Sequence, residues 1–187
     1  VKDPKTAELL CPDNHPIGTK RLILDSQYYE IFNEDHVELV DVRSAPITEI
    51  TETGIRTTDQ LYELDAIAFA TGFDAMTGAM REIDIKVKDG PSLDEQWEAG
   101  PRTYLGVMVA GLPNLFMITG PQSPGVKSQM ILSIEWHVDW IADCLQYMKD
   151  KEFNRIEAKL DAQENWVKHV KEVADSTLYP LANSWYM

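Results

Sequence analysis

The sequence has few cysteines and little positive charge. Cys11 and Cys144 are the only cysteines among 187 residues, and they form no C-x-x-C pair. Isolated cysteines argue against a metal site or a disulfide scaffold, although one disulfide stays open, and they favour a reducing, cytoplasmic compartment. Lysine and arginine number 17 against 31 aspartates and glutamates, a net charge of −14. This balance disfavours nucleic acid and anionic membrane surfaces as partners.

Several catalytic and nucleotide-binding motifs are also missing. The sequence contains no H-E-x-x-H, no G-x-S-x-G, no P-loop and no G-x-G-x-x-G. Zinc hydrolases, nucleophile-elbow hydrolases, nucleotide triphosphatases and the opening of a dinucleotide-binding fold therefore lack their local signatures. The longest uncharged stretch, Tyr104 to Gly120, is too short for a membrane span and is broken by Pro113. We expect this stretch to form buried core.

Apolar runs bounded by turn residues predict an α/β protein with short strands. Two of the runs end in glycine-containing loops, Thr71-Gly72 and Thr119 to Gly125. Loops at the carboxyl ends of strands are where open α/β sheets bind ligands. The Thr53-Gly54 pair between two of the runs predicts a hairpin. The predicted strands are Glu38–Val42, Ile47–Glu52, Ile55–Thr58, Leu61–Ala70 and Leu115–Ile118.

Two amphipathic helices are expected in the last third of the chain. The second is predicted to begin at Asp161, whose side chain would cap it while Glu164 reaches back, and to end before Pro180. The first is predicted over residues 128–150, packed by an apolar stripe of Met130, Ile134, Val138, Ile141, Leu145 and Met148.

Lys20 and Arg21 are two adjacent cations that precede an apolar Leu22-Ile23-Leu24. On charge alone, a solvated basic turn is the favoured interpretation. The alternative is a binding site, because a guanidinium cannot deprotonate and suits an anionic intermediate, whereas a lysine suits a monophosphate. The histidines on the two helices, His137 and His169, are expected at the surface or boundary rather than in a catalytic role.

Taken together and in order, six segments resemble type I Baeyer–Villiger monooxygenases of the phenylacetone and cyclohexanone monooxygenase group. The resemblance covers Gly18 to Met187, and its most specific piece is ATGFDAMTG. The segments are GTKRLILDSQYYEIFN, VELVDVRSAPI, YELDAIAFATGFDAMTGAM, GPRTYLG, GLPNLFMITGP and SIEWHVDWIADC.

The resemblance implies the C-terminal portion of a Rossmann-like flavoprotein with two dinucleotide-binding domains. The glycine motifs for FAD and NADP would precede this portion. Residues 1–60 would finish the NADP-binding domain with a linker, and residues 61–187 would form the C-terminal part of the FAD-binding domain. The missing N-terminal lobe is thus an implied partner, and apolar surface is expected where it docks.

The implied activity is insertion of one oxygen atom of dioxygen next to a ketone carbonyl, giving an ester or lactone through a C4a-peroxyflavin. FAD and NADPH are the implied cofactors, and the chain by itself is expected to be inactive. Two alternatives stay open: a flavin-dependent N- or S-oxygenase of the same superfamily, and an inactive truncated interaction module.

The resemblance also assigns roles to single positions. Arg21 matches the active-site arginine beside the flavin, and Lys20 the lysine that contacts the 2′-phosphate of NADPH. Thr71 and Gly72 of the ATG segment are assigned to cofactor binding. Met130 matches a methionine bordering the flavin and the substrate pocket, and Trp185 a tryptophan that folds over the nicotinamide cofactor.

The implied substrate pocket is a bulge in the chain formed by Ser123, Pro124, Gly125, Val126 and Lys127. Gln122 stands where the family usually has glycine, and Gln129 where it has asparagine. Lys127 occupies a commonly apolar position. It either favours a polar or anionic ketone or points to solvent.

Overall fold

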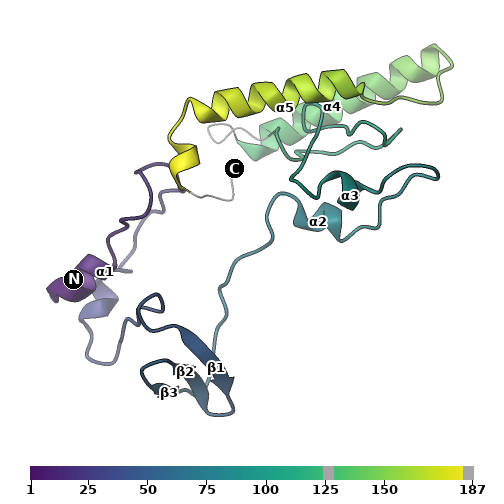
Figure 1. Ribbon diagram of the computed structural model, residues 1–187. Helices are drawn as coiled ribbons and strands as arrows, with labels where there is room; N and C mark the ends of the chain where they lie inside the picture. The colour runs from purple at the N-terminus through teal and green to yellow at the C-terminus, as the bar shows by residue number, and fades with distance from the viewer. Residues whose placement is uncertain (124–128, 183–187) are drawn as a thin grey trace. The chain divides into compact units, whose positions relative to one another are not determined.

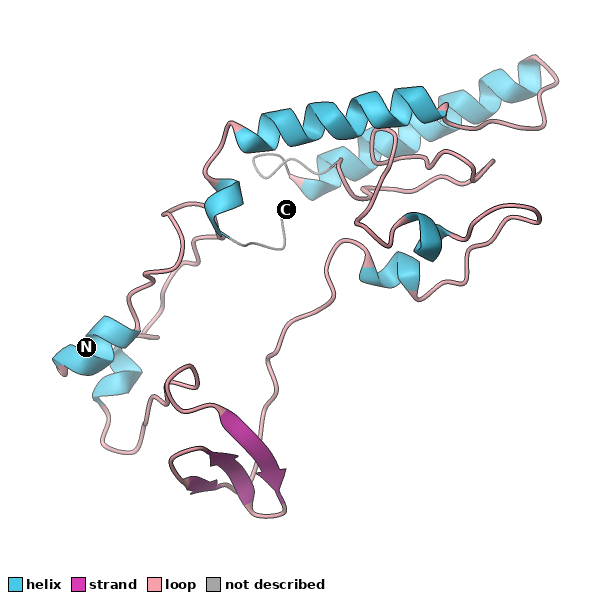
Figure 2. Ribbon diagram, in the orientation of Figure 1, coloured by secondary structure: helices cyan, strands magenta, loops and turns pink. Residues whose placement is uncertain are grey.

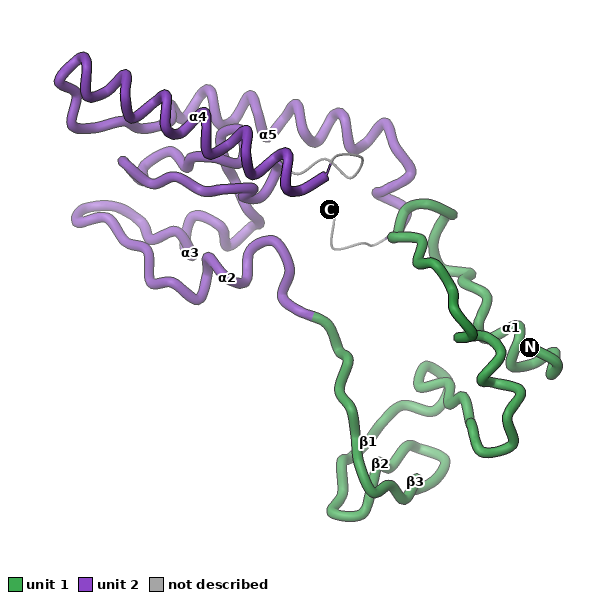
Figure 3. The backbone as a smooth tube through the Cα atoms, turned by 180° about the vertical axis from the view of Figure 1, so that it is seen from behind, with its two compact units in different colours: residues 1–72 green, residues 73–187 purple. Residues whose placement is uncertain are grey.

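The computed structural model describes residues 1–123 and 129–182, which divide into two compact units. The first unit is Val1–Gly72 and the second is Phe73–Met187 (Figure 3). The assignment of residues 1–60 and 61–187 to the two dinucleotide-binding domains stays a prediction.

The first unit contains a three-stranded antiparallel sheet of order β1-β2-β3, at the lower edge of Figure 1. The strands are β1 (Ile47–Thr51), β2 (Gly54–Thr57) and β3 (Leu61–Glu63), so the predicted hairpin is confirmed. Gly54 is required because a Cβ there would collide with the carbonyl oxygen of Tyr62 on β3. The unit's helices are short: α1 (Pro4–Leu9), capped by Asp3, and the 3-10 helix η1 (Glu30–Asn33).

Two strand predictions in this unit are wrong. The segment Glu38–Val42 leads into a turn, where the Ala45 N–H donates to the carbonyl of Asp41 at 3.0 Å. Of Leu61–Ala70, only Leu61–Glu63 pairs with a neighbour. A strand is defined by its ladder, and the described part of the chain offers no partner to residues 65–70.

The regular elements of the second unit are helices, joined by long loops (Figure 2). Its short helices are α2 (Gly78–Arg81) and α3 (Leu93–Gln96), and α3 begins with a capping box between Ser92 and Glu95. The long helices are α4 (Met130–Asp150) and α5 (Leu160–Asp175), followed by the 3-10 helix η2 (Tyr179–Ala182). Both predicted helices are therefore confirmed as elements. None of the helices in residues 1–123 and 129–182 has the length and apolar character that a membrane span needs.

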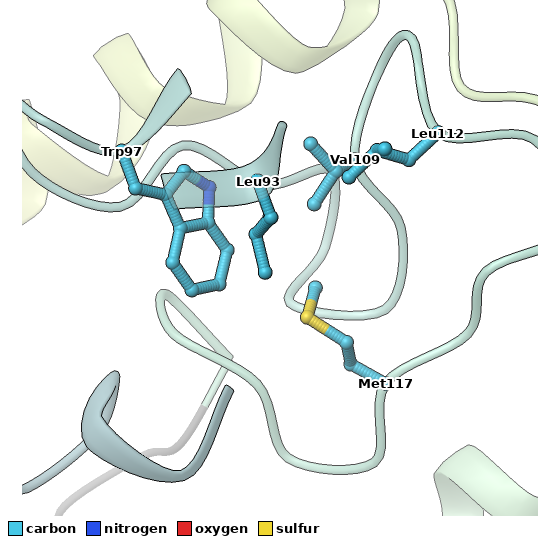
Figure 4. Packing of buried hydrophobic residues seen from close by; sticks show 5 residues of the cluster. All are labelled: Leu93, Trp97, Val109, Leu112 and Met117. Atoms are coloured by element: carbon cyan, nitrogen blue, oxygen red, sulfur yellow. The ribbon is translucent and has the colours of Figure 1, made fainter. Parts of the chain in front are cut away.

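The stretch Tyr104 to Gly120, expected to be buried, supplies part of the core of the second unit. Leu93 and Trp97 of the α3 region pack against Val109, Leu112 and Met117 (Figure 4). The Trp97 Nε1–H donates to the carbonyl of Arg102 at 3.1 Å, so the buried indole is satisfied.

The predicted strand Leu115–Ile118 does not form in this core. Met117 N–H does donate to the carbonyl of Val107 at 2.8 Å. A single bond of this kind shows that the two segments cross. It does not make a β-ladder, because a strand needs a neighbour that runs alongside it.

The buried face of α4 differs from the predicted one. Met130, Ile134, Val138 and Leu145 are 46%, 38%, 45% and 49% exposed, so most of the expected stripe is uncovered. The buried residues of α4 are Met148, which belongs to the stripe, and His137, which does not. Only Ile141 and Met148 of the predicted stripe face the interior.

The predicted cap of α5 is also wrong. Its N-cap residue is Lys159, which makes no capping hydrogen bond through its side chain, and Asp161 lies inside the first turn. There the carboxylate still favours the helix through the positive end of the helix dipole. Glu164, predicted to reach back to the cap, instead forms an ion pair with Arg102.

Polar side chains link the loop of residues 110–114 to residues 154–163, which include the start of α5. Gln163 is 3% exposed, and its Oε1 accepts the N–H of Ala110 at 2.8 Å. Glu157 accepts the N–H of Gly111 at 2.9 Å, and Asn114 exchanges side-chain bonds with the backbone of residues 154 and 156. These bonds satisfy loop amides that no strand partner reaches.

Candidate functional site

The candidate residues divide between the two units, so each group has its own geometry. In the first unit, a tight turn presents Lys20 and Arg21. Thr19 is 2% exposed, and its hydroxyl donates to the carbonyl of Pro16 at 2.6 Å. Gly18 allows this turn through its φ of 81°.

Lys20 and Arg21 themselves are exposed. Neither forms an ion pair with any residue of 1–123 or 129–182. The following Leu22, Ile23 and Leu24 are 73%, 86% and 97% exposed. Two cations without an ion-pair partner in the described residues thus lie beside uncovered apolar surface. Their N–H groups are the hydrogen-bond donors that a phosphate or an anionic oxygen requires.

Thr71 and Gly72 are also exposed, at the end of the first unit. Gly72 has a φ of 91°, a conformation that favours glycine. The flanking Phe69 and Phe73 are 68% and 98% exposed. The apolar side chains that flank Thr71 and Gly72 are therefore uncovered.

In the second unit, a candidate segment fixed by several hydrogen bonds is the turn of residues 119–123, which ends at Ser123. The Gly120 N–H donates to the carbonyl of Gly106 at 3.1 Å, and both the N–H and the hydroxyl of Ser123 donate to the carbonyl of Gly120. A Cβ at Gly106 would collide with the side chain of Ser123. The close approach of the two loops therefore depends on Gly106, whose φ is 68°.

Gln122 anchors this turn from its other side. Its Oε1 accepts the Thr103 N–H at 3.0 Å and lies 3.1 Å from the Thr103 hydroxyl, and its Nε2 donates to the carbonyl of Pro101 at 3.1 Å. Thr103 is fully buried and also donates its hydroxyl to the carbonyl of Pro121. The side chain of Gln122 thus fixes the segment before the predicted pocket, although the φ of this residue is 67°.

His137 is a residue that sequence reasoning missed. It is 4% exposed rather than at the surface, and its Nδ1 accepts the N–H of Thr119 at 2.8 Å. Burial lowers the pKa of His137 below its usual value. The signal that could have found it is the run His137, Ile141, Cys144 and Met148, which follows a helical period on a face that adjoins the expected stripe and shares Ile141 and Met148 with it. By contrast, His169 is exposed as expected.

A cavity of about 320 Å³ lies where the turn, α4 and α5 meet. Ser123 and His137 both line it, so the end of the turn and the histidine share one space. The complete lining is Leu105, Ser123, Leu132, Ser133, Trp136, His137 and Trp166.

The remaining candidates are less informative. Met130 is the first residue of α4 and is exposed. Pro124, Gly125, Val126 and Lys127 lie outside the described residues, as does Trp185.

The whole chain is similar to several curated monooxygenases. It is 46% identical over 188 residues to cyclopentanone 1,2-monooxygenase of Comamonas sp. (strain NCIMB 9872), covering 100% of this chain and 34% of that relative. It is 38% identical to a phenazine N-monooxygenase of Lysobacter antibioticus, covering 99% of this chain and 34% of that one. The chain thus spans about a third of the length of these relatives. No protein-family model matches it.

Solved structures give the same picture. OTEMO in complex with FAD and NADP matches with a TM-score of 0.95 and 42% identity, over 99% of this chain and 35% of that one. Oxidized steroid monooxygenase bound to NADP matches with a TM-score of 0.90 and 50% identity, over 100% of this chain and 36% of that one. The chain therefore has the fold of the corresponding part of a flavoprotein monooxygenase.

Proposed function

The chain belongs to the Baeyer–Villiger monooxygenase family, of whose matched members it spans about a third, and we propose that it serves the same reaction. That reaction inserts one atom of dioxygen next to a ketone carbonyl and yields an ester or a lactone. The observation that carries the proposal is the match of the whole chain, at 46% identity, to a cyclopentanone monooxygenase.

FAD and NADPH are the proposed cofactors, since relatives with 42% and 50% identity are named as bound to FAD and NADP or to NADP. When bound, they supply the electrons that activate dioxygen. The exposed, unpaired Lys20 and Arg21 fit such anionic groups. A cradle of glycine amides for a pyrophosphate would come from outside the chain, because the sequence has no G-x-G-x-x-G.

Arg21 is proposed as the catalytic residue. A guanidinium offers a planar fork of donors to an oxygen that carries negative charge. In a site closed to water, this attraction is much stronger than in solution. Lys20, a compact charge on a flexible stem, is proposed to bind the 2′-phosphate and so to favour NADPH over NADH.

The substrate pocket is proposed to lie around Ser123 to Lys127 and Met130. Support comes from the bonds that fix the turn leading into this segment, through Gln122, Gly106 and His137. A pocket wall held by many bonds positions a small ketone better than a free loop would. Thr71, Gly72 and Trp185 are proposed as further cofactor contacts.

A test can use a joined protein, in which this chain replaces the matching third of the Comamonas cyclopentanone monooxygenase. Arg21→Ala in the joined protein should lower ester formation by about a hundredfold or more, the scale seen when a donor to an anionic oxygen is removed. NADPH oxidation should continue. The assay follows lactone by gas chromatography and NADPH by absorbance.

Arg43→Ala is the matched control. Arg43 lies in the same unit, and its side chain is 71% exposed with an ion pair of 3.7 Å to Asp13. Because exposed pairs contribute little, this variant should keep lactone formation within about twofold. Full lactone formation by the Arg21 variant would refute the assigned role.

A second candidate function is N-oxygenation, favoured by the 38% identity to a phenazine N-monooxygenase. The joined protein can be given cyclopentanone and phenazine in separate reactions. Lactone without N-oxide supports the ketone reaction, and N-oxide without lactone supports the second candidate.

A further inference from the structure

His137 joins two segments that are distant in sequence. Its ring lies on α4, and its Nδ1 accepts the backbone N–H of Thr119 at 2.8 Å. An imidazole nitrogen that accepts a hydrogen bond carries no proton, so the neutral ring must hold its proton on Nε2. The contact therefore requires one tautomer of an uncharged histidine.

The turn that receives this contact is not favourable by itself. Thr119 has a φ of 51° and Gln122 a φ of 67°. Both values lie in the left-handed region, which residues other than glycine rarely adopt. Such a conformation persists only where surrounding bonds impose it. His137 supplies the bond at the start of the turn, and Gln122 the bonds near its end.

The environment of the ring keeps it neutral. Burial is the cause that lowers the pKa of His137, with no contribution from a charged group. The other described residues lining the shared cavity carry no charge. Glu135 and Asp139 flank His137 in sequence and are exposed on α4. Two further titratable residues adjoin the lining of the cavity: Tyr104, next to Leu105 in sequence, and His169 on α5, whose ring lies 5.7 Å from that of Trp166.

We propose that His137 is a positioning residue, which holds the turn of residues 119–123 through its neutral Nδ1 and so sets the place of Ser123 in the wall of the cavity that both residues line. The proposal rests on the function proposed above, with this cavity taken as part of the substrate site. When the ring is protonated, Nδ1 becomes a donor facing the Thr119 N–H. The bond is then lost and the turn is released as the solution becomes acidic.

The sign of the pH effect follows from linkage. The folded-state pKa of His137 lies below its unfolded value, so the unfolded chain binds more protons between the two. The stabilising contact is complete above the unfolded pKa and is lost as the pH falls through the folded one. The proposal thus places the transition on the acidic side of the ordinary histidine range.

Two substitutions separate the Nδ1 contact from the bulk of the ring. In His137→Asn, the amide oxygen falls near the place of Nδ1 and accepts from Thr119 without titrating. In His137→Gln, the amide oxygen reaches toward the place of Nε2 instead. His169→Asn and His169→Gln are matched controls on the exposed position of α5.

The first readout is hydrogen exchange of the Thr119 amide in the joined protein, measured by NMR. At neutral pH, His137→Asn should keep the protection factor, and His137→Gln should lower it about tenfold, the effect of losing one ordinary hydrogen bond. Ring nitrogen shifts of the unsubstituted protein should report the Nε2–H tautomer. Equal protection in the two variants, or an Nδ1–H tautomer, would overturn the proposal.

The second readout is the pH profile of kcat/KM for cyclopentanone. The unsubstituted protein should lose kcat/KM on the acidic side as the turn is released, and His137→Asn should lack that loss. An identical acidic limb in both proteins would contradict the positioning role. If neither protein forms lactone at any pH, the proposed function has failed, and hydrogen exchange still decides the fate of the turn contact.

Discussion

At the scale of single residues, Gln122 illustrates how one side chain compensates for an unfavourable backbone. Its φ of 67° would suit glycine, yet its amide group makes bonds to Thr103 and Pro101 that a glycine could not make. The Thr103 N–H is buried, and without this acceptor it would be unsatisfied. The side-chain bonds of Gln122 thus offset a backbone conformation that is unfavourable for any residue but glycine.

Gln122→Ala should therefore destabilise the joined protein by about 1–3 kcal/mol, because a buried donor loses its acceptor while the backbone strain remains. Gln122→Gly should cost about 1 kcal/mol less, since it relieves the left-handed conformation. Urea unfolding measures both. Gln146→Ala, at an exposed glutamine of α4, is the control. Equal stability of the Ala and Gly variants would refute the strain argument.

The role of a residue could be predicted from the sequence only where the residue belongs to a motif shared with a known family. Arg21 was assigned through the family resemblance of GTKR, and its exposed, unpaired state agrees with a role toward an external anion. His137 carries no such mark. Its burial is decided by which face of α4 meets the core, and that depends on contacts with residues far along the chain.

At the scale of elements, local sequence patterns correctly predicted the two long helices and the hairpin. The other strand predictions were wrong because a strand needs a partner that is distant in sequence. The helix over Met130–Asp150 and the hairpin of β1 and β2 depend on periodicity and a tight turn, which are properties of neighbouring residues. The segments 65–70 and 115–118 have the composition of strands but lack partners in the described chain. Composition alone cannot supply a ladder.

The hydrogen bond between Gln163 of α5 and the loop of residues 110–114 leads to a prediction at this scale. Gln163→Leu should speed hydrogen exchange of the Ala110 amide in the joined protein about tenfold or more, because the buried N–H loses its acceptor. The exposed amides of α1 should be unaffected. Unchanged exchange at Ala110 would mean that Gln163 does not hold the loop.

At the scale of the whole molecule, much of the apolar surface is uncovered. Leu24 and Phe73 are 97% and 98% exposed, and α4 presents Ile131, Leu132 and Trp136 at 58% to 66%. Such a surface marks an interaction site. We expect the part of the family fold that the chain does not span to cover it, which would also bring the remaining cofactor-binding groups.

The central claim is that this chain serves oxygen insertion into a ketone. The most direct measurement is mass spectrometry of the product that the joined protein makes from cyclopentanone under heavy-isotope dioxygen, with the unjoined chain assayed alongside. The account predicts a lactone that carries one heavy oxygen atom from the joined protein, about a hundredfold less or lower still from the Arg21→Ala variant, and no lactone from the unjoined chain. A flavin-loaded joined protein that oxidises NADPH but forms no labelled lactone would contradict the account.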